Sequence, residues 1–442
     1  MYTRKLLVLV FMISIFIWAD ATYGRLINVP SQATTIQAGI DSANAGDTVM
    51  VASGTYTGTG NINVNFNGKA IVVRSYAGSQ STIIDCSPAG NRAFTFDQGE
   101  TLTSKLIGFT IRNGDVRHRY SGGYPDKNGG ALKIKASPSI RSCIFENCQA
   151  VLGGAITVQI ADVEPEIYQC TFRHDSTDAE LGCHGGAIYY GSGAKLTVSY
   201  CTFDANYAYS SGGAIYAGGD TTVVEESIFY SNICPGNGAA ITALNTTIVR
   251  ASTFAKNHAL YGDAVLAATG SNLQLKRNII AFNTGHYGAV RSNINSTITF
   301  ECNDFWNNHN GSITGTYDST YVDSNSIFGN PLFCDLPNDD YSISAHSPCD
   351  EDSSQCGLLI GAVMVNCDYC CWLGGDANND NNVNIQDVTF LQNCLYYGGQ
   401  CPPCQDSGDP NHTCVINIQD MTFIINYLYK GGPAPVCGCV SH

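Results

Sequence analysis

Charged residues are scarce in this chain, and basic residues are the scarcest. Only 22 of the 442 residues are Lys or Arg, against 37 Asp and Glu, which gives a formal net charge of −15. No run of basic residues stands out, so a nucleic-acid partner is not expected, because phosphate binding needs a basic face. Helical runs of 12 or more residues are missing from the middle of the chain, which excludes βαβ units and a helical bundle there.

Long apolar runs are also lacking beyond the first 20 residues, so no later transmembrane span is predicted. The first run, residues 6–19, follows Arg4 and Lys5 and ends at Ala19-Asp20-Ala21. This pattern predicts a cleaved signal peptide over residues 1–21; the alternative is a membrane anchor, for which the run is short. A secreted, extracellular location would account for the 20 cysteines, because disulfides persist outside the cytosol.

Glycine is abundant, with 46 residues, and two motifs that contain small or apolar residues recur about every 25 positions. The first is Gly-Gly-Ala followed by Leu or Ile, beginning at Gly129, Gly153, Gly185 and Gly212. The second is a Phe followed three residues later by Asn, as in Phe203/Asn206, Phe229/Asn232, Phe254/Asn257 and Phe305/Asn308. A fixed period with short alternating runs between the motifs indicates stacked β units. The sequence therefore predicts a mainly β fold, a parallel β-helix over residues 25–367.

The repeats also predict what each column of residues does. The Phe column stacks in the core, and the Asn column forms a hydrogen-bonded ladder at a corner. Cys143, Cys170 and Cys201 occupy a further inward column, as buried thiols; a metal cluster is not expected because they lie in a line. Residues 35–56 predict an N-terminal cap with a short helix over 36–43. Residues 329–333 and 340–345 predict the last coils, stapled by Cys334, Cys349, Cys356 and Cys367.

These features resemble known β-helix proteins. The opening TIQAGID…GDTVMVASGTY resembles bacterial right-handed β-helix proteins of the pectate-lyase-like superfamily. The alternation of GGA[IL] and FxxN resembles the repeats of chlamydial polymorphic outer-membrane proteins. The resemblance covers about residues 30–365 and implies a right-handed parallel β-helix. It leaves the chemistry open, because one fold hosts many functions.

The C-terminal region contains a twelve-residue loop with oxygen ligands at positions 1, 3, 5, 7, 9 and 12, which is the EF-hand spacing for Ca²⁺. The loop recurs 33 residues later, followed in both cases by a predicted helix. The ligands of the first loop are Asp376, Asn378, Asp380, Asn382 (backbone), Asn384 and Asp387, and those of the second are Asp409, Asn411, Thr413, Val415 (backbone), Asn417 and Asp420. Thr413 leaves the second loop with only two carboxylates, which predicts weaker calcium binding there.

The duplicated loop and helix resemble the type I dockerin domain, over residues 372–437. The resemblance implies two Ca²⁺ ions and a cohesin-like protein partner, bound through the residues just past position 9 of each loop. In this chain these residues are Ile385, Gln386, Ile418 and Gln419, where many cellulosomal members have Ser-Thr. Cysteines at 401, 404, 437 and 439 predict disulfides that clasp a small exported module, for example from Cys370 or Cys371 to Cys437 or Cys439; zinc is the alternative.

No catalytic motif is present in the sequence, but two corner insertions, residues 115–128 and 174–184, are predicted to overhang one face. Their candidate catalytic residues are Arg117, His118, Arg119, Lys127, Asp175, Asp178 and His184. A polysaccharide lyase needs a base and a cation that neutralises the uronate carboxyl, roles that Arg117, Arg119 or Lys127 could fill, with Asp175 and Asp178 as calcium ligands. The alternative is two solvated loops.

The sequence leaves two functions open. The first is a secreted β-helix that binds or processes extracellular polysaccharide, as a lyase or glycoside hydrolase if it is an enzyme, and docks through its C-terminal module. The second is a non-catalytic surface or adhesion protein that assembles through the same module.

Overall fold

The computed structural model describes residues 24–88, 90–117, 124–177, 182–262, 264–315, 320–367, 371, 373–380, 382–402 and 404–438. The predicted signal peptide, residues 1–21, lies outside them. Across these ranges, no helix has the length and apolar character needed to span a membrane.

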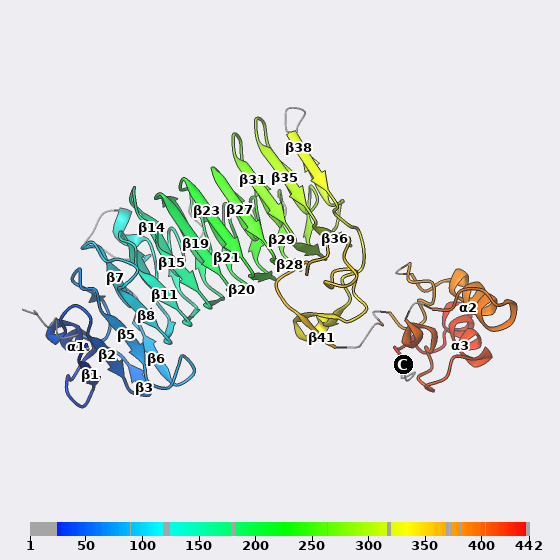
Figure 1. The fold of residues 1–442 in the computed structure, drawn as a ribbon, viewed down its shortest axis with the longest axis horizontal. Coiled ribbons are helices and arrows are strands. Elements are labelled where there is room, and N and C mark those ends of the chain that lie inside the picture. The colour runs from blue at the N-terminus through cyan, green and yellow to red at the C-terminus, as the bar shows by residue number, and fades with distance from the viewer. Residues whose placement is uncertain are drawn as a thin grey trace, which may run out of the picture.

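Short parallel strands stack into a solenoid of successive coils, coloured from blue to yellow in Figure 1. Four sheets run along the stack, with neighbouring strands mostly in direct register. The long sheet runs from β1 (Leu26–Val29) to β38 (Thr320–Ser324), and the ladder sheet runs from β3 (Gly54–Tyr56) to β36 (Asp304–Trp306). The tyrosine sheet runs from β4 (Val64–Asn65) to β37 (Ile313–Gly315). The short sheet runs from β13 (Gln149–Ala150) to β33 (Thr284–Gly285).

The Asn column forms the predicted ladder at the corner that follows the ladder sheet. The Oδ1 atom of Asn257 accepts hydrogen bonds from the backbone N–H and the Nδ2 of Asn232, at 3.1 and 2.9 Å. The Nδ2 of Asn257 donates in turn to the backbone oxygen of Phe229 at 2.9 Å. The pattern repeats from Asn206 to Asn308. The prediction of an aligned Asn column is therefore confirmed.

The Phe column lies inside the same coils. The rings of Phe203 and Phe229 stack with centroids 4.5 Å apart and planes only 4° from parallel. Phe172 and Phe254 extend this stack at both ends, with centroid separations of 4.8 Å. All four rings are fully buried, so the column supplies much of the apolar area that single coils cannot bury alone.

A second polar ladder occupies the corner between the long sheet and the ladder sheet. Its members include Cys170, whose N–H donates to the Sγ of Cys201 at 3.4 Å, and Asn278, whose N–H donates to the Oδ1 of Asn303 at 3.0 Å. Cys143, Cys170 and Cys201 are free and buried, and burial raises the pKa of the Cys143 and Cys170 thiols well above its usual value. The interpretation as buried thiols is confirmed. In the described ranges, no three His, Cys, Asp or Glu side chains are grouped to hold a metal.

The N-terminal end has the predicted cap. Helix α1 (Ile36–Ser42) begins after Thr35, whose hydroxyl accepts the N–H of Ala38 at 3.2 Å. Ile36 and Ile40 are fully buried against the first coils, which begin with β1 and β2 (Thr48–Val51).

The segment after the last coil differs from the prediction. Strands β39 (Phe333–Asp335) and β40 (Asp340–Ser344) are antiparallel, so residues 329–333 and 340–345 do not form further coils. Instead they pack with Ala255 and Ala281 on the outer side of the ladder sheet. The small outward alanines leave room for this segment to lie flat on β28 (Thr253–Ala255) and β32 (Ile279–Ala281).

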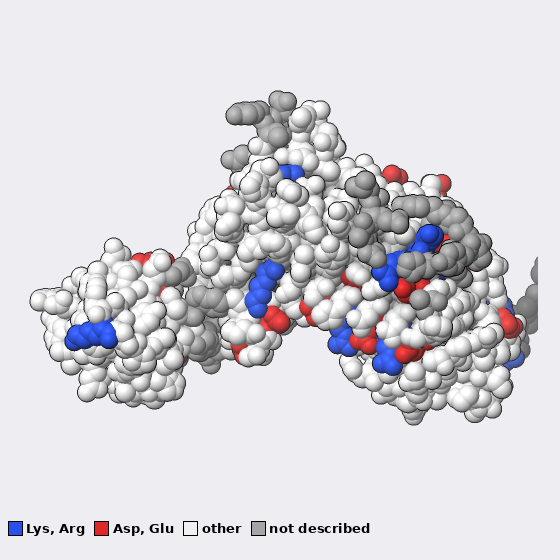
Figure 2. All heavy atoms as spheres, turned by 180° about the vertical axis from the view of Figure 1, so that it is seen from behind, with Lys and Arg blue, Asp and Glu red and all other residues white. Residues whose placement is uncertain are grey.

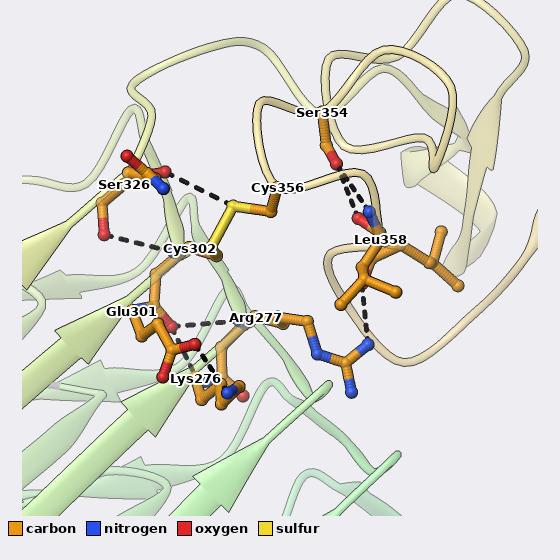
Figure 3. Close-up of a disulfide and its surroundings, with 12 residues drawn as sticks. Lys276, Arg277, Glu301, Cys302, Ser326, Ser354, Cys356 and Leu358 are labelled. Atoms are coloured by element: carbon orange, nitrogen blue, oxygen red, sulfur yellow. Dashed lines mark hydrogen bonds and ion pairs between the residues drawn. A yellow bond between two sulfur atoms is a disulfide. The ribbon is translucent and has the colours of Figure 1, made fainter.

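Two disulfides fasten this segment, and they differ in part from the predicted set. Cys334 pairs with Cys367, but Cys356 pairs with Cys302 of the last full coil, and Cys349 is a buried free thiol. Figure 3 shows the Cys302–Cys356 bridge beside the Lys276–Glu301 ion pair, with Arg277 reaching the returning chain. Cys349 is fully buried, and its thiol donates to the Oδ2 atom of Asp304 at 3.3 Å.

The C-terminal module contains two helices of the same length, α2 (Ile385–Tyr397) and α3 (Ile418–Lys430). Each begins with a reciprocal capping box, Asn384 with Asp387 and Asn417 with Asp420, and each ends at a glycine in the left-handed conformation. Leu391 and Ile424 are completely buried between them.

Disulfides hold this module, as the sequence predicted. Cys371 pairs with Cys437, and Cys394 pairs with Cys401, so zinc is the wrong alternative for Cys401 and Cys437. Cys404 is also disulfide-bonded, and Cys370 and Cys439 lie outside the described residues.

Candidate functional site

The four catalytic candidates that the structure describes, Arg117, Lys127, Asp175 and His184, have separate surroundings. Arg117 forms an ion pair with Asp115, with Nη2 and Oδ2 3.0 Å apart. Lys127 ends the short helix η1 (Tyr124–Lys127). His118, Arg119 and Asp178 lie outside the described residues.

Asp175 is not on the surface, so its prediction as a calcium ligand of an exposed loop is wrong. Its side chain is fully buried, and its Oδ1 accepts the N–H of Cys148 at 2.8 Å. Its own N–H donates to the Oδ1 of Asn206 at 3.0 Å, which makes it a rung of the Asn ladder. Burial raises the pKa of the Asp175 carboxyl well above its usual value. Residues 174–177 therefore belong to the coil, and the insertion is shorter than predicted.

His184 is part of an aromatic stack on the outer side of the tyrosine sheet. Its ring lies 4.6 Å from that of Tyr216, and the rings of Tyr189 and Tyr216 are 5.0 Å apart and nearly parallel. Partial burial lowers the pKa of His184 below its usual value. The neutral imidazole is thus favoured, which suits packing in a stack better than holding a charge.

The stack belongs to a line of outward side chains that we call the outward row. In each GGA[IL] motif the Leu or Ile points into the core, and the next residue points out because strand side chains alternate. Strand pairing aligns these residues along the solenoid: Asn65, Thr95, Lys133, Thr157, Tyr189, Tyr216 and Thr242. Thr157 and Thr242 are buried by the chain around them, and the other five are partly exposed. The row was missed from the sequence, although its position after each motif could have identified it.

A polar cavity of about 250 Å³ lies at the N-terminal end of the outward row. Lys133 donates to the Oδ1 of Asp126 at 2.7 Å, and the Nδ2 of Asn65 donates to the Oδ1 of Asp97 at 3.0 Å. The cavity lining consists of Asn63, Asn65, Arg92, Thr95, Asp97, Asp126 and Lys133. This combination of amide, hydroxyl and charged groups can bind the hydroxyls of a sugar.

Arg92 holds η1 beside this cavity. Arg92 is 1% exposed, and its guanidinium donates to the backbone oxygens of Asn128 and Asp126, at 2.9 and 2.6 Å. The first corner insertion is therefore anchored to the coil at its end. On the face drawn in Figure 2, most of the surface is uncharged, and acidic and basic side chains are often neighbours.

The first predicted calcium loop is folded around its acidic residues. The Oδ1 of Asp376 accepts the N–H of Asp380 at 2.9 Å, and the Oδ1 of Asp380 accepts that of Asn382 at 2.9 Å. Asp387 accepts the N–H groups of Asn378 and Asn384, at 3.2 and 2.8 Å. These bonds order the loop backbone around its carboxylates.

The second loop has the same form with fewer charges. Asp409 is buried and accepts the N–H groups of Thr413 and Cys414, at 2.9 and 2.7 Å. The Oδ1 atoms of Asn411 and Asp420 are buried and have no hydrogen-bond partner. Burial, with the nearby Asp409, raises the pKa of Asp420 to about 6. Unpartnered oxygens and two neighbouring carboxylates are the chemistry that a hard cation satisfies, so the donor types of the second loop suit Ca²⁺. Acidic side chains alone do not surround a metal position anywhere in the described residues.

The predicted partner residues are exposed at matching positions. Ile385 at the start of α2 is 48% exposed, and Ile418 at the start of α3 is 56% exposed. Gln386 and Gln419 follow them directly, and the N–H of each donates to the capping Asn.

Comparison with known proteins identifies the β-helix. A model of the right handed beta helix region matches residues 163–327. A solved structure, described as a mannuronic acid specific polysaccharide family 6 lyase enzyme from human gut microbiota, is 11% identical over 65% of this chain and 82% of that chain, with a TM-score of 0.26. No curated protein matches the chain. Together with the coil geometry above, the match to the right handed beta helix region confirms the predicted right-handed parallel β-helix.

Proposed function

We propose that this chain is a secreted β-helix protein that binds extracellular polysaccharide along its outward row and is attached to a cohesin-like partner by a calcium-dependent, dockerin-like module. The observation that carries the docking role is the duplication of a loop, capping box and helix at one spacing, with an exposed Ile at the same place in each copy.

Calcium would be held by the six ligands of each loop. When bound, the ion supplies positive charge to carboxylates that otherwise repel one another, as Asp409 and Asp420 do. The loop residues then present the starts of α2 and α3 to the partner, where Ile385, Gln386, Ile418 and Gln419 make contact. An exposed Ile in each copy suits a partner surface that is apolar at its centre.

We expect calorimetry of the full chain to detect two Ca²⁺ ions, with the first loop the tighter. Asp376→Ala should remove the tighter event and Asp409→Ala the weaker one, because carboxylate count tunes affinity and the second loop has only two. A larger loss of calcium affinity from Asp409→Ala would contradict the assignment.

The outward row supports binding of polysaccharide more than its cleavage. Lys133, which lines the cavity, is already paired with Asp126, and the candidate Arg117 is paired with Asp115. Asp175, a candidate from the sequence, is enclosed in the core. Thr157 and Thr242 are buried, so the accessible part of the row consists of Asn65, Thr95, Lys133, Tyr189 and Tyr216. These amide, hydroxyl and aromatic groups suit contact with sugar rings.

We expect Tyr216→Ala to weaken binding of soluble pectate or alginate by about fivefold, because an aromatic contact contributes about 1 kcal/mol beyond its buried area. Affinity electrophoresis over both polymers measures this. Tyr76→Ala, at an exposed tyrosine outside the row, is the matched control and should bind like the native chain. Equal binding by the native chain, Tyr216→Ala and Tyr76→Ala would exclude the outward row as the polysaccharide-binding surface.

An absorbance assay for unsaturated uronates over the same polymers tests the enzymatic alternative. Product that disappears on replacement of Lys127 or Arg117 would make the chain a lyase. Tight binding without product supports the binding role, and cell or protein binding without glycan binding supports the adhesion alternative.

A further inference from the structure

A short segment after α3, residues 435–438, lies against the second predicted calcium loop and against the residues that enter the first. We call it the strap. The N–H of Val436 donates to the backbone oxygen of Pro410 at 3.2 Å, and the N–H of Gly438 donates to that of Asp406 at 2.8 Å. The Nδ1 of His412 lies 2.7 Å from the backbone oxygen of Cys437. Pro410 and His412 are positions 2 and 4 of the second loop, so the strap is bonded directly to that loop.

The strap packs without spare room. A methyl group on Gly438 would lie 2.5 Å from the Cβ and 2.6 Å from the Oδ2 of Asp409, the first ligand of the second loop. A methyl group on Gly374, two residues before Asp376, would lie 2.1 Å from the backbone of Val436. The strap therefore touches the entrance of the first loop and the first ligand of the second.

A disulfide holds the strap in this place. Cys437 is bonded to Cys371, five residues before the first ligand of the first loop, across a sequence separation of 66. This bond ties the strap to the chain that enters the first loop. The second loop has a further covalent tie, because its Cys414 is also disulfide-bonded.

We propose that the strap, locked by the Cys371–Cys437 disulfide, holds the second loop in its calcium-binding conformation and couples it to the first. This rests on the proposed function, in which the loops bind calcium. The second loop needs such support because it has only two carboxylates and places His412 and Cys414 at φ of 57° and 62°. Non-glycine residues are strained there, and surrounding structure must stabilise them. A loop that is ordered beforehand loses less entropy on binding.

The test compares calcium calorimetry of the native chain with Gly438→Ala and with the double variant Cys371→Ala/Cys437→Ala. We expect both variants to weaken calcium binding at the second loop by about tenfold or more, because the loop must then become ordered at the moment the ion binds. The matched control is Cys394→Ala/Cys401→Ala, which removes the disulfide at the far end of α2 and should leave both affinities within about twofold.

Hydrogen exchange of the calcium-free proteins is the second readout. We expect the amides of Thr413 and Cys414, which are bonded to Asp409, to exchange faster in the strap variants and at the native rate in the control. If Gly438→Ala has the calcium affinities and the exchange rates of the native chain, the proposed role of the strap is wrong, while the calcium sites stand. If the native chain takes up no calcium, the proposed docking function fails. Hydrogen exchange at Thr413 and Cys414 then decides by itself whether the strap orders the second loop. Gly438→Ala keeps the disulfide and decides the question if the double variant does not fold.

Discussion

Asn257→Leu should destabilise the β-helix by about 4 kcal/mol or more, because buried groups left without partners cost about 1–3 kcal/mol each. Leu keeps the branched shape of Asn but removes its oxygen and nitrogen. The change leaves the N–H of Asn232 and the backbone oxygen of Phe229 without the bonds that Asn257 makes. The Nδ2 of Asn232 also loses one of its two acceptors. The loss falls in the middle of the ladder, where neither solvent nor a chain end can replace it.

Denaturant unfolding followed by circular dichroism measures this loss, and amide exchange in the neighbouring coils shows where it acts. Asn44→Leu, at an exposed asparagine, is the control and should change stability by less than about 0.5 kcal/mol. If Asn257→Leu unfolds within about 1 kcal/mol of the native chain, the ladder contributes little beyond shape.

The repeat was predictable from the sequence because each coil repeats the same inward residues. Phe229 and Asn232 occupy the same positions in their coil as Phe203 and Asn206 in the coil before, and this spacing alone implied stacking. The helices of the C-terminal module were predictable for a similar reason, since the capping Asn and the terminal Gly occur twice. Periodicity identifies the positions that point inward, and those positions determine the core.

The structural features that the sequence did not predict correctly are those that do not repeat from coil to coil. The antiparallel hairpin β39–β40 contains strand-like residues, and nothing local distinguishes it from another coil. Its partner surface, with Ala255 and Ala281, is distant in sequence. The outward row was missed because its residue type changes from coil to coil, from Asn and Thr to Lys and Tyr, so no single residue repeats along it.

Asp175 shows how a repeat can be overlooked at one position. It follows Phe172 by three residues, the spacing that defines the Asn column, yet its carboxyl suggested a surface ligand. In the structure it accepts the N–H of Cys148 as an Asn would, but its Oδ2 has no hydrogen-bond partner. In the next coil, the corresponding Nδ2 of Asn206 donates to the backbone oxygen of Phe172 at 3.0 Å.

Asp175→Asn should therefore stabilise the chain at pH 7, by about 1–3 kcal/mol, the cost of a buried polar group without a partner. The new amide can donate to the backbone oxygen of Phe145, as Asn206 does to that of Phe172. The gain should depend on pH. Burial raises the pKa of Asp175 in the folded chain above the value of about 4 that it has when unfolded. The charges that face it are Glu146, which adds to this rise, and Arg173, which opposes it.

Because the folded chain holds this proton more tightly, the contribution of Asp175 to stability is largest below pH 4 and is lost as the pH rises towards its folded pKa. The amide does not titrate, so the advantage of Asp175→Asn should be small at pH 4 and largest at pH 7 and above. Unfolding midpoints of both proteins across this range measure the difference. A gain in stability that stays constant from pH 4 to pH 8 would mean that Asp175 has the same pKa in the folded and the unfolded chain. No gain at any pH would mean that the ladder is not destabilised by the missing hydrogen-bond donor at Asp175.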